Sequence, residues 1–320
     1  MDEFALIELL RPPPGAARPD VRLGMGDDGA VLVPPPACEL VAATDLLVAG
    51  RHFPEGTDPE ALGHKALAVN LSDLAAMGAE PAWALLQLSL PEADGDFVAA
   101  FARGFHRLAG EHRVALVGGD TVRGPLAVGV TVLGWVAAGG ALTRAGARPG
   151  HRIYVTGSLG DAALGLACRQ GGCDLPGPLR DQVVERLERP RPRLAAGRAL
   201  APQASAGIDI SDGLPADLGH LLAASGCGAR LQAAELPWSE AGRAFLAAGG
   251  DRRLLLEGGD DYELCLTVAP ERERALCQIA RELAVPLTCI GTVEAEPGIR
   301  LAEADGGLQD LPAAGYRHFP

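Results

Sequence analysis

The stretch KALAVNLSDLAAMG, residues 65–78, gives the clearest indication of how the chain folds. Ala and Leu dominate it, its interior lacks Gly and Pro, and Gly78 closes it, so it predicts a helix. Apolar residues surround its polar ones, which indicates a buried helix. Asn70 and Asp73 lie three residues apart on one face. A buried carboxylate needs a partner or a metal, so we expect Asp73 to meet a cation or a hydrogen-bond network; neighbouring amides are the simpler alternative.

The composition sets this helix apart. Lys65 is the only Lys among 28 basic residues, and Asn70 is the only Asn in the chain. Both residue types are otherwise avoided, and both are present in this one helix. That coincidence points to a specific role for the helix beyond packing.

The bulk properties restrict the class of protein. A chain of 320 residues with 48% hydrophobic residues suits two domains. A net charge of −13 argues against nucleic acid and anionic membranes as partners. Phosphorylated ligands stay compatible with such a chain only if divalent ions such as Mg²⁺ bridge the like charges.

The cysteines and the chain ends indicate a location. Seven Cys occur without a Cys-x-x-Cys pair, which is typical of reduced thiols in an intracellular protein. The N-terminus lacks the pattern of a signal peptide, and the most apolar stretch, 126–142, is shorter than a membrane span. We therefore expect a soluble, cytoplasmic protein.

Acidic residues recur beside Gly or Ser at the ends of predicted elements. Asp27 and Asp28 follow glycines that match G-x-G-x-x-G, but no strong strand precedes them and no helix follows, so we interpret the segment as a loop. Asp45 follows Thr44 in a predicted strand, 39–48. Asp120 follows a strand, 114–117, in a predicted Gly-Gly turn. The Asp27-Asp28 segment also fits an ordinary polar turn, and Thr44-Asp45 also fits a polar pair on an edge strand.

The second half repeats this pattern. Asp209 and Asp212 flank Ser211 ahead of a predicted helix, 216–225, and Asp260-Asp261 precede a strand, 264–268. If all these carboxylates converge, their repulsion demands several divalent ions. Such a cluster is typical of metal-assisted phosphoryl transfer.

The remaining pattern predicts two domains of α/β or α+β type. Residues 137–140, Ala-Ala-Gly-Gly, resemble a boundary. Further helices are predicted at 2–10, 97–111 and 271–283, and further strands at 82–90, 126–136, 152–156 and 287–293. The Gly157–Gly160 turn opens another helix and lacks the Lys of a P-loop.

Six collinear motifs, spread nearly from end to end, resemble the thiamine-monophosphate kinase family of the aminoimidazole-ribonucleotide-synthetase-like superfamily. They are Gly26-Asp27-Asp28, residues 72–79 (SDLAAMGA), residues 118–121 (GGDT), residues 142–144 (LTR), residues 209–214 (DISDGL) and residues 258–264 (GGDDYEL).

The resemblance implies direct, in-line transfer of the γ-phosphate of ATP to thiamine monophosphate, giving thiamine diphosphate. It implies a homodimer with an N-terminal α/β domain, 1–138, that binds ATP and Mg²⁺ and pairs with its mate. A C-terminal α+β domain, 139–320, would complete the active-site cleft. The nucleophile is an ionised phosphate oxygen, so no covalent or general-base residue is expected.

The resemblance also implies roles for individual residues. The several Mg²⁺ ions would be held by Asp28, Thr44, Asp45, Asp73, Asp120, Asp209 and Asp212. ATP would contact Gly119, Asp120, Arg144 and Ser211. Thiamine monophosphate would face His52, Asp260 and Tyr316. The chain departs from the family pattern at Asp260, where Glu is usual, and at Ala43, where many members have Ser.

Two other classes of function stay open at this point. One is a different ATP-using member of the superfamily, an aminoimidazole ribonucleotide or selenophosphate synthetase or a hydrogenase maturation protein. A selenophosphate synthetase should have a reactive Cys near its N-terminus, but the first Cys here is Cys38. A hydrogenase maturation protein should end in Cys, but this chain ends in Pro320. The other class is a non-catalytic module that binds Mg²⁺ and nucleotide; a purely structural dimer would leave Asp73 unexplained.

Overall fold

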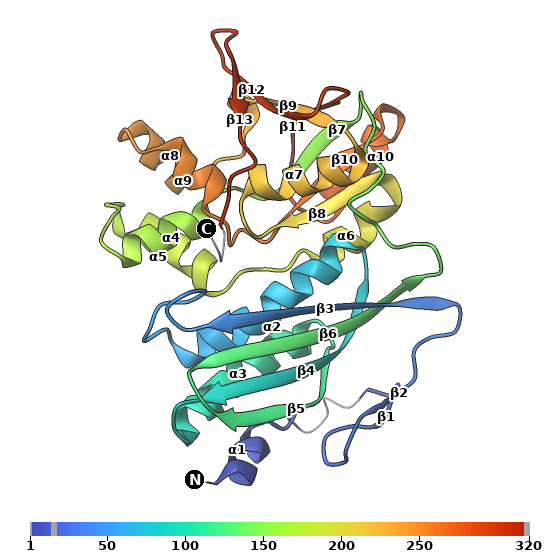
Figure 1. Cartoon of the computed structure of the whole chain (residues 1–320), viewed down its shortest axis with the longest axis vertical. Coiled ribbons are helices and arrows are strands. Elements are labelled where there is room, and N and C mark those ends of the chain that lie inside the picture. Colours follow the sequence, from blue (N-terminus) through green and yellow to red (C-terminus); the bar gives the residue numbers. More distant parts are fainter. Residues whose placement is uncertain (1, 14–17, 317–320) are drawn as a thin grey trace. The chain divides into compact units, whose positions relative to one another are not determined.

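The computed structural model describes residues 2–13 and 18–316 (Figure 1). The chain divides into two compact units. The first comprises Met1–Leu74 and Ala79–Gly140, and the second comprises Ala75–Gly78 and Ala141–Pro320. Both units combine helices with a mixed sheet, so the predicted fold class is confirmed. The functional domains 1–138 and 139–320 stay a prediction.

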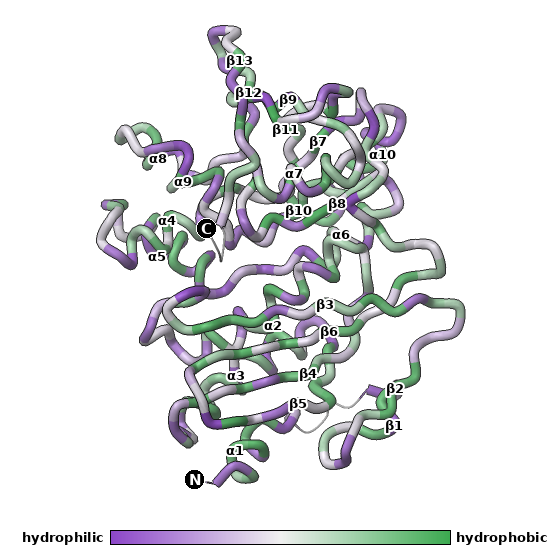
Figure 2. The backbone as a smooth tube through the Cα atoms, in the orientation of Figure 1, coloured by the Kyte–Doolittle hydropathy of each residue, from purple (hydrophilic) through white to green (hydrophobic). Residues whose placement is uncertain are grey.

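The first unit is built on a four-stranded sheet with the order β3-β6-β4-β5. Only the pair β4–β5 is parallel. Valines 128, 130 and 132 of β6 are fully buried, and Figure 2 shows hydrophobic colour along much of β4 and β6. The strands are β3 (Cys38–Val48), β4 (Glu80–Leu90), β5 (Ala115–Arg123) and β6 (Ala127–Ala137).

Three helices and a small hairpin complete this unit. Helices α2 (Pro59–Ala76) and α3 (Gly95–Glu111) lie against the sheet, and α1 (Glu3–Leu10) packs on α3 (Figure 1). Strands β1 (Val21–Leu23) and β2 (Val31–Leu32) pair with each other.

Helix α2 confirms the prediction for residues 65–78 but begins earlier, at Pro59. Gly78 has φ 70°, a left-handed conformation suited to the end of a helix. Lys65 and Asn70 are buried. Asp73 is only half-buried, because it lies in the last turn of the helix, so the expectation of a buried carboxylate is wrong.

Helices α2 and α3 touch through two glycines. A Cβ atom on Gly63 would overlap the carbonyl oxygen of Phe101, and one on Gly104 would overlap that of Glu60. The two backbones therefore lie in direct contact, and only Gly fits at either position. This contact fixes the spacing of the helical layer that packs on the sheet.

The predicted turn at residues 118–121 is wrong, because β5 continues through it to Arg123. The pairing with β4 shifts register between Ala84 and Leu85, opposite this point. A Cβ atom on Gly119 would overlap the carbonyl oxygen of Leu86. The glycines here allow close approach of two strands, and Asp120 lies within a strand.

The second unit contains a seven-stranded sheet with the order β13-β12-β9-β11-β7-β10-β8. The pair β12–β9 is parallel and the others are antiparallel. The strands are β7 (Arg152–Thr156), β8 (Ala206–Ile210), β9 (Gly228–Gln232), β10 (Glu263–Val268), β11 (Leu287–Glu294), β12 (Gly298–Ala302) and β13 (Leu308–Leu311).

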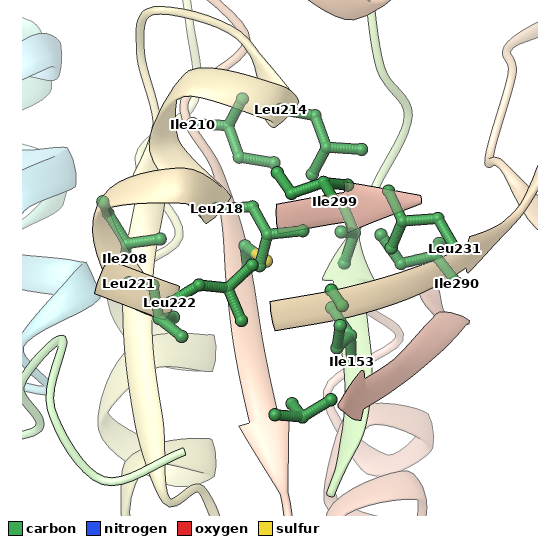
Figure 3. Close-up of a cluster of buried hydrophobic side chains, with 14 of the residues drawn as sticks. Ile153, Ile208, Ile210, Leu214, Leu218, Leu221, Leu222, Leu231, Ile290 and Ile299 are labelled. Atoms are coloured by element: carbon green, nitrogen blue, oxygen red, sulfur yellow. The ribbon is translucent and has the colours of Figure 1, made fainter. Parts of the chain in front are cut away.

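Within residues 141–316, seven helices accompany this sheet. They are α4 (Asp161–Arg169), α5 (Gly177–Glu188), α6 (Leu194–Leu200), α7 (Leu214–Ser225), α8 (Glu240–Ala247), α9 (Arg252–Glu257) and α10 (Glu273–Glu282). Figure 3 shows the core of the unit, where Leu218, Leu221 and Leu222 of α7 meet Ile153 and Ile208 of the sheet. Packing of α7 on the sheet thereby fixes the position of the loop between β8 and α7.

Substituting Gly104→Ala tests the contact between α2 and α3. The added methyl group meets backbone that cannot move aside, so the free energy of unfolding should fall by about 2–4 kcal/mol. Gly110, in the same helix, has open space around it. Gly110→Ala should leave stability unchanged or raise it by up to about 1 kcal/mol. Urea unfolding followed by circular dichroism measures both, and equal effects would contradict the close contact.

Candidate active site

In the first unit, the predicted ligands Thr44 and Asp45 lie on the edge strand β3. The Thr44 hydroxyl donates to the carbonyl of Val130 at 3.1 Å and lies 3.0 Å from the hydroxyl of Thr131. The Asp45 backbone N–H donates to Oδ1 of Asn70 at 2.9 Å. The Asn70 side chain also donates to the Ala66 carbonyl at 3.0 Å. The single Asn of the chain thus ties α2 to β3 beside Asp45.

Asp120 lies on the other edge of the same sheet. Asp45 pairs with Val130, Val130 with Leu86, and Leu86 with Gly119. Three strand spacings separate the β3 and β5 edges, which is about 14 Å. Within one chain, the structure therefore does not bring Asp45 and Asp120 together.

Two further predicted residues of this unit lie in turns. Asp28 is exposed between β1 and β2, and its N–H donates to Oδ1 of Asp27 at 2.9 Å. His52 closes the turn after β3, where its Nδ1 accepts from the Val48 N–H at 2.9 Å and its own N–H donates to the Val48 carbonyl at 3.0 Å. The ring of His52 is thereby held in place.

The second unit brings four predicted residues together. The Asp260 N–H donates to the Ser211 carbonyl at 2.7 Å, and the Tyr316 N–H donates to the Asp212 carbonyl at 3.1 Å. Asp209 is buried in β8, two residues before Ser211, where this loop begins. Residues predicted for ATP and metal therefore adjoin residues predicted for the substrate.

The turn that carries Asp260 has an unusual backbone. Asp260 has φ 62° and Tyr262 has φ 50°, both in the left-handed region that side chains disfavour. The Tyr262 hydroxyl donates to Oδ1 of Asp260 at 2.9 Å, and its N–H donates to the carbonyl of Ile210 at 2.8 Å. Such strain persists where the surroundings over-determine a conformation, as at functional sites.

Arg144 lies away from this group. The Ser225 hydroxyl, at the end of α7, donates to the Arg144 carbonyl at 3.0 Å. The loop with Ser211 precedes the other end of that helix, so the backbone of Arg144 is not beside it. Its predicted contact with ATP stays a prediction.

Buried ionic side chains support the Asp260 turn, and of these sequence analysis singled out Asp261 but not the cluster of Glu263 with Arg186 and Arg193. The fully buried Glu263 accepts from Arg186 at 2.6 Å, from Arg193 at 2.5 Å and from the Thr156 hydroxyl at 2.7 Å. Asp261 accepts from the Gly160 N–H at 2.9 Å. Burial raises the pKa of Asp261 well above its usual value.

No three His, Cys, Asp or Glu side chains gather as a metal-binding group within residues 2–13 and 18–316. No helix of those residues is long and apolar enough to cross a membrane. The predicted metal ligands are divided between the two units, and within the first unit Asp45 and Asp120 lie on opposite edges of the sheet. The full set stays a prediction.

Comparison with known proteins places the chain. Its residues 26–136 match the N-terminal domain, and 148–303 the C-terminal domain, of AIR synthase related proteins. It is 46% identical over 320 residues to thiamine-monophosphate kinase of Salmonella typhimurium, covering 99% of this chain and 98% of that protein. The chain belongs to the thiamine-monophosphate kinase family.

Solved structures agree with this family. A thiamine-monophosphate kinase from Stenotrophomonas maltophilia has a TM-score of 0.87 at 45% identity, covering 96% of this chain and 97% of that one. AaThiL complexed with AMPPCP and TMP has a TM-score of 0.79 at 31% identity, covering 99% and 97%. The hydrogenase maturation protein HypE of E. coli, at 21% identity and TM-score 0.79, shares the fold. The resemblance inferred from the motifs is confirmed.

Asp261→Asn tests the burial of that carboxyl group. Because its pKa is raised on folding, its contribution to stability is full below the unfolded-state pKa and is lost as pH rises through the folded-state pKa. Asn cannot ionise. The free energy of unfolding of the variant should therefore rise relative to that of the parent protein by about 1–3 kcal/mol between pH 5 and pH 9.

Thermal unfolding at several pH values measures this difference. The exposed Asp181→Asn in α5 is the matched control and should show no such gain with pH. An Asp261→Asn variant whose stability relative to the parent protein does not rise between pH 5 and pH 9 would contradict the assignment.

Proposed function

We propose that the chain phosphorylates thiamine monophosphate with ATP, giving thiamine diphosphate and ADP. The observation that carries the proposal is full-length membership of the thiamine-monophosphate kinase family at 46% identity. The structure adds a local reason, since the loop of Ser211 and Asp212 is hydrogen-bonded to the backbones of Asp260 and Tyr316. Groups for the two substrates therefore share one framework.

The chemistry suits such a framework. The attacking atom is a phosphate oxygen that is already ionised, so the protein needs to align two phosphates and neutralise charge. Ser211 would orient the ATP phosphates, and Asp260 would face the thiazolium cation. Asp260 is one methylene shorter than the usual Glu, and the hydrogen bond from Tyr262 fixes its direction.

The predicted metal ligands fit Mg²⁺. They are six carboxylates and one hydroxyl, the hard oxygen donors that Mg²⁺ prefers. Asp28, Thr44, Asp45 and Asp120 are exposed, Asp73 and Asp212 are half-buried, and Asp209 is buried at a strand end. Bound Mg²⁺ supplies the positive charge that lets phosphates approach these acidic residues.

A homodimer explains how Asp45 and Asp120 act together. They lie on opposite open edges of one sheet, and the same sheet exposes Leu40, Leu46 and Val122. A second copy covering this apolar surface brings the β5 edge of one chain toward the β3 edge of the other. We propose that each site takes Asp45 and Asp120 from different chains.

The seven free cysteines are consistent with a reducing compartment. With the net charge of −13, they support a cytoplasmic enzyme that uses neither nucleic acid nor a membrane as partner.

The first test measures thiamine diphosphate formed from thiamine monophosphate and ATP, with Mg²⁺ and with EDTA. Product should form only with Mg²⁺. Asp120→Asn should lower turnover about 100-fold or more, because charge neutralisation is lost, while the exposed Asp310→Asn in β13 should leave it unchanged. ATP binding without product would favour another activity of the superfamily or a binding module.

The dimer proposal predicts complementation between inactive variants. Asp45→Asn and Asp120→Asn chains, unfolded together and refolded, should regain about a quarter of the parent activity, because half of the dimers are mixed and each then has one intact site. Each variant refolded alone is the control. No recovery from mixed dimers would place both residues in one chain's site.

A further inference from the structure

The loop between β8 and α7 is held by a carboxylate that lies beyond it in the sequence. Asp217, in the first turns of α7, is buried with 3% of its surface exposed. Its Oδ2 accepts three consecutive backbone N–H groups, from Ser211 at 2.9 Å, Asp212 at 2.9 Å and Gly213 at 3.1 Å. One oxygen atom therefore satisfies every N–H of the loop.

The other side of the same peptides is also fixed. The Ser211 carbonyl accepts from Asp260, and the Asp212 carbonyl accepts from Tyr316. The peptide planes between 211 and 212 and between 212 and 213 are thus held at both ends. With those planes fixed, the Cα–Cβ directions of Ser211 and Asp212 are fixed as well.

We propose that Asp217 is a positioning residue that sets the direction of Ser211 and Asp212 toward the ATP phosphates and Mg²⁺. Through the same two peptides, it holds Ser211 and Asp212 at a fixed position relative to Asp260 and Tyr316. The inference rests on the proposed function, because only a two-substrate reaction needs this fixed relative position.

Position, and not charge, is what this arrangement requires of Asp217. Three N–H groups converge on one oxygen, and a neutral amide oxygen at the same place also accepts them, although each bond is weaker. A carboxylate displaced by one methylene cannot meet all three N–H groups without moving the loop.

Asp217→Asn and Asp217→Glu show whether the position or the charge of the side chain matters. Asn keeps the acceptor in place, and Glu keeps the charge. The binding probe is Mg²⁺ with AMPPCP, measured by calorimetry, and turnover is measured in parallel. We expect Asn to bind within about threefold of the parent protein, and Glu to bind at least about tenfold more weakly with lower kcat. Asp94→Ala removes another carboxylate that accepts two N–H groups, at the start of α3, and should change neither.

Thermal unfolding of each variant separates positioning from stability. A Glu variant that stays folded yet binds weakly supports the proposal. Binding retained by Glu and lost by Asn, or retained by both, overturns it. If the parent protein binds Mg²⁺ and AMPPCP but does not phosphorylate thiamine monophosphate, the proposed function fails, and the binding comparison still decides the role of Asp217.

Discussion

The second unit depends on how it satisfies backbone N–H groups that have no hydrogen-bond partner in a helix or a sheet. The loop between β8 and α7 presents three of them in succession, and Asp217 accepts all three. Because an unsatisfied buried N–H is costly, the loop has one low-energy path. The turn of Asp260 and the segment of Tyr316 add their own N–H groups to the outward carbonyls. Three distant stretches of chain thereby become one rigid framework.

In the first unit, three of the predicted metal ligands, Thr44, Asp45 and Asp120, lie on strands of one sheet and not on a loop. Asn70 holds the backbone of Asp45 from the helical layer, and the glycine contact between α2 and α3 sets how closely that layer is packed. Strand pairing then fixes where each acidic residue lies along its edge. A sheet positions residues accurately within an edge, but it also separates its two edges by its full width.

Local pattern predicted the longer helices, such as α2, α3, α7 and α10, and the long strands well, since their periodicity and end signals lie within a few residues of each other. It did not predict the shorter helices α6, α8 and α9. The turn predicted at Gly118 and Gly119 was wrong, because glycine often indicates a turn in a sequence but here permits close approach of two strands. The shorter strands β9, β12 and β13 owe their existence to pairing that no local signal records. Asp217 was missed because an Asp in a first helical turn is ordinary, and only the folded loop shows what it accepts. The separation of Asp45 from Asp120 depends on strand order, which spacing does not reveal.

The supporting layer beneath the Asp260 turn has a consequence for protons. Arg186 and Arg193 both pair with Glu263, while the neighbouring Asp161 and Glu263 disfavour ionisation of the buried Asp261. Burial and these like charges hold the pKa of Asp261 well above its usual value. In an unfolded chain at neutral pH the same carboxyl group is ionised. Folding therefore raises the affinity of this group for a proton, and wherever the pH lies between its unfolded-state and folded-state pKa values the heat of folding includes the ionisation enthalpy of the buffer.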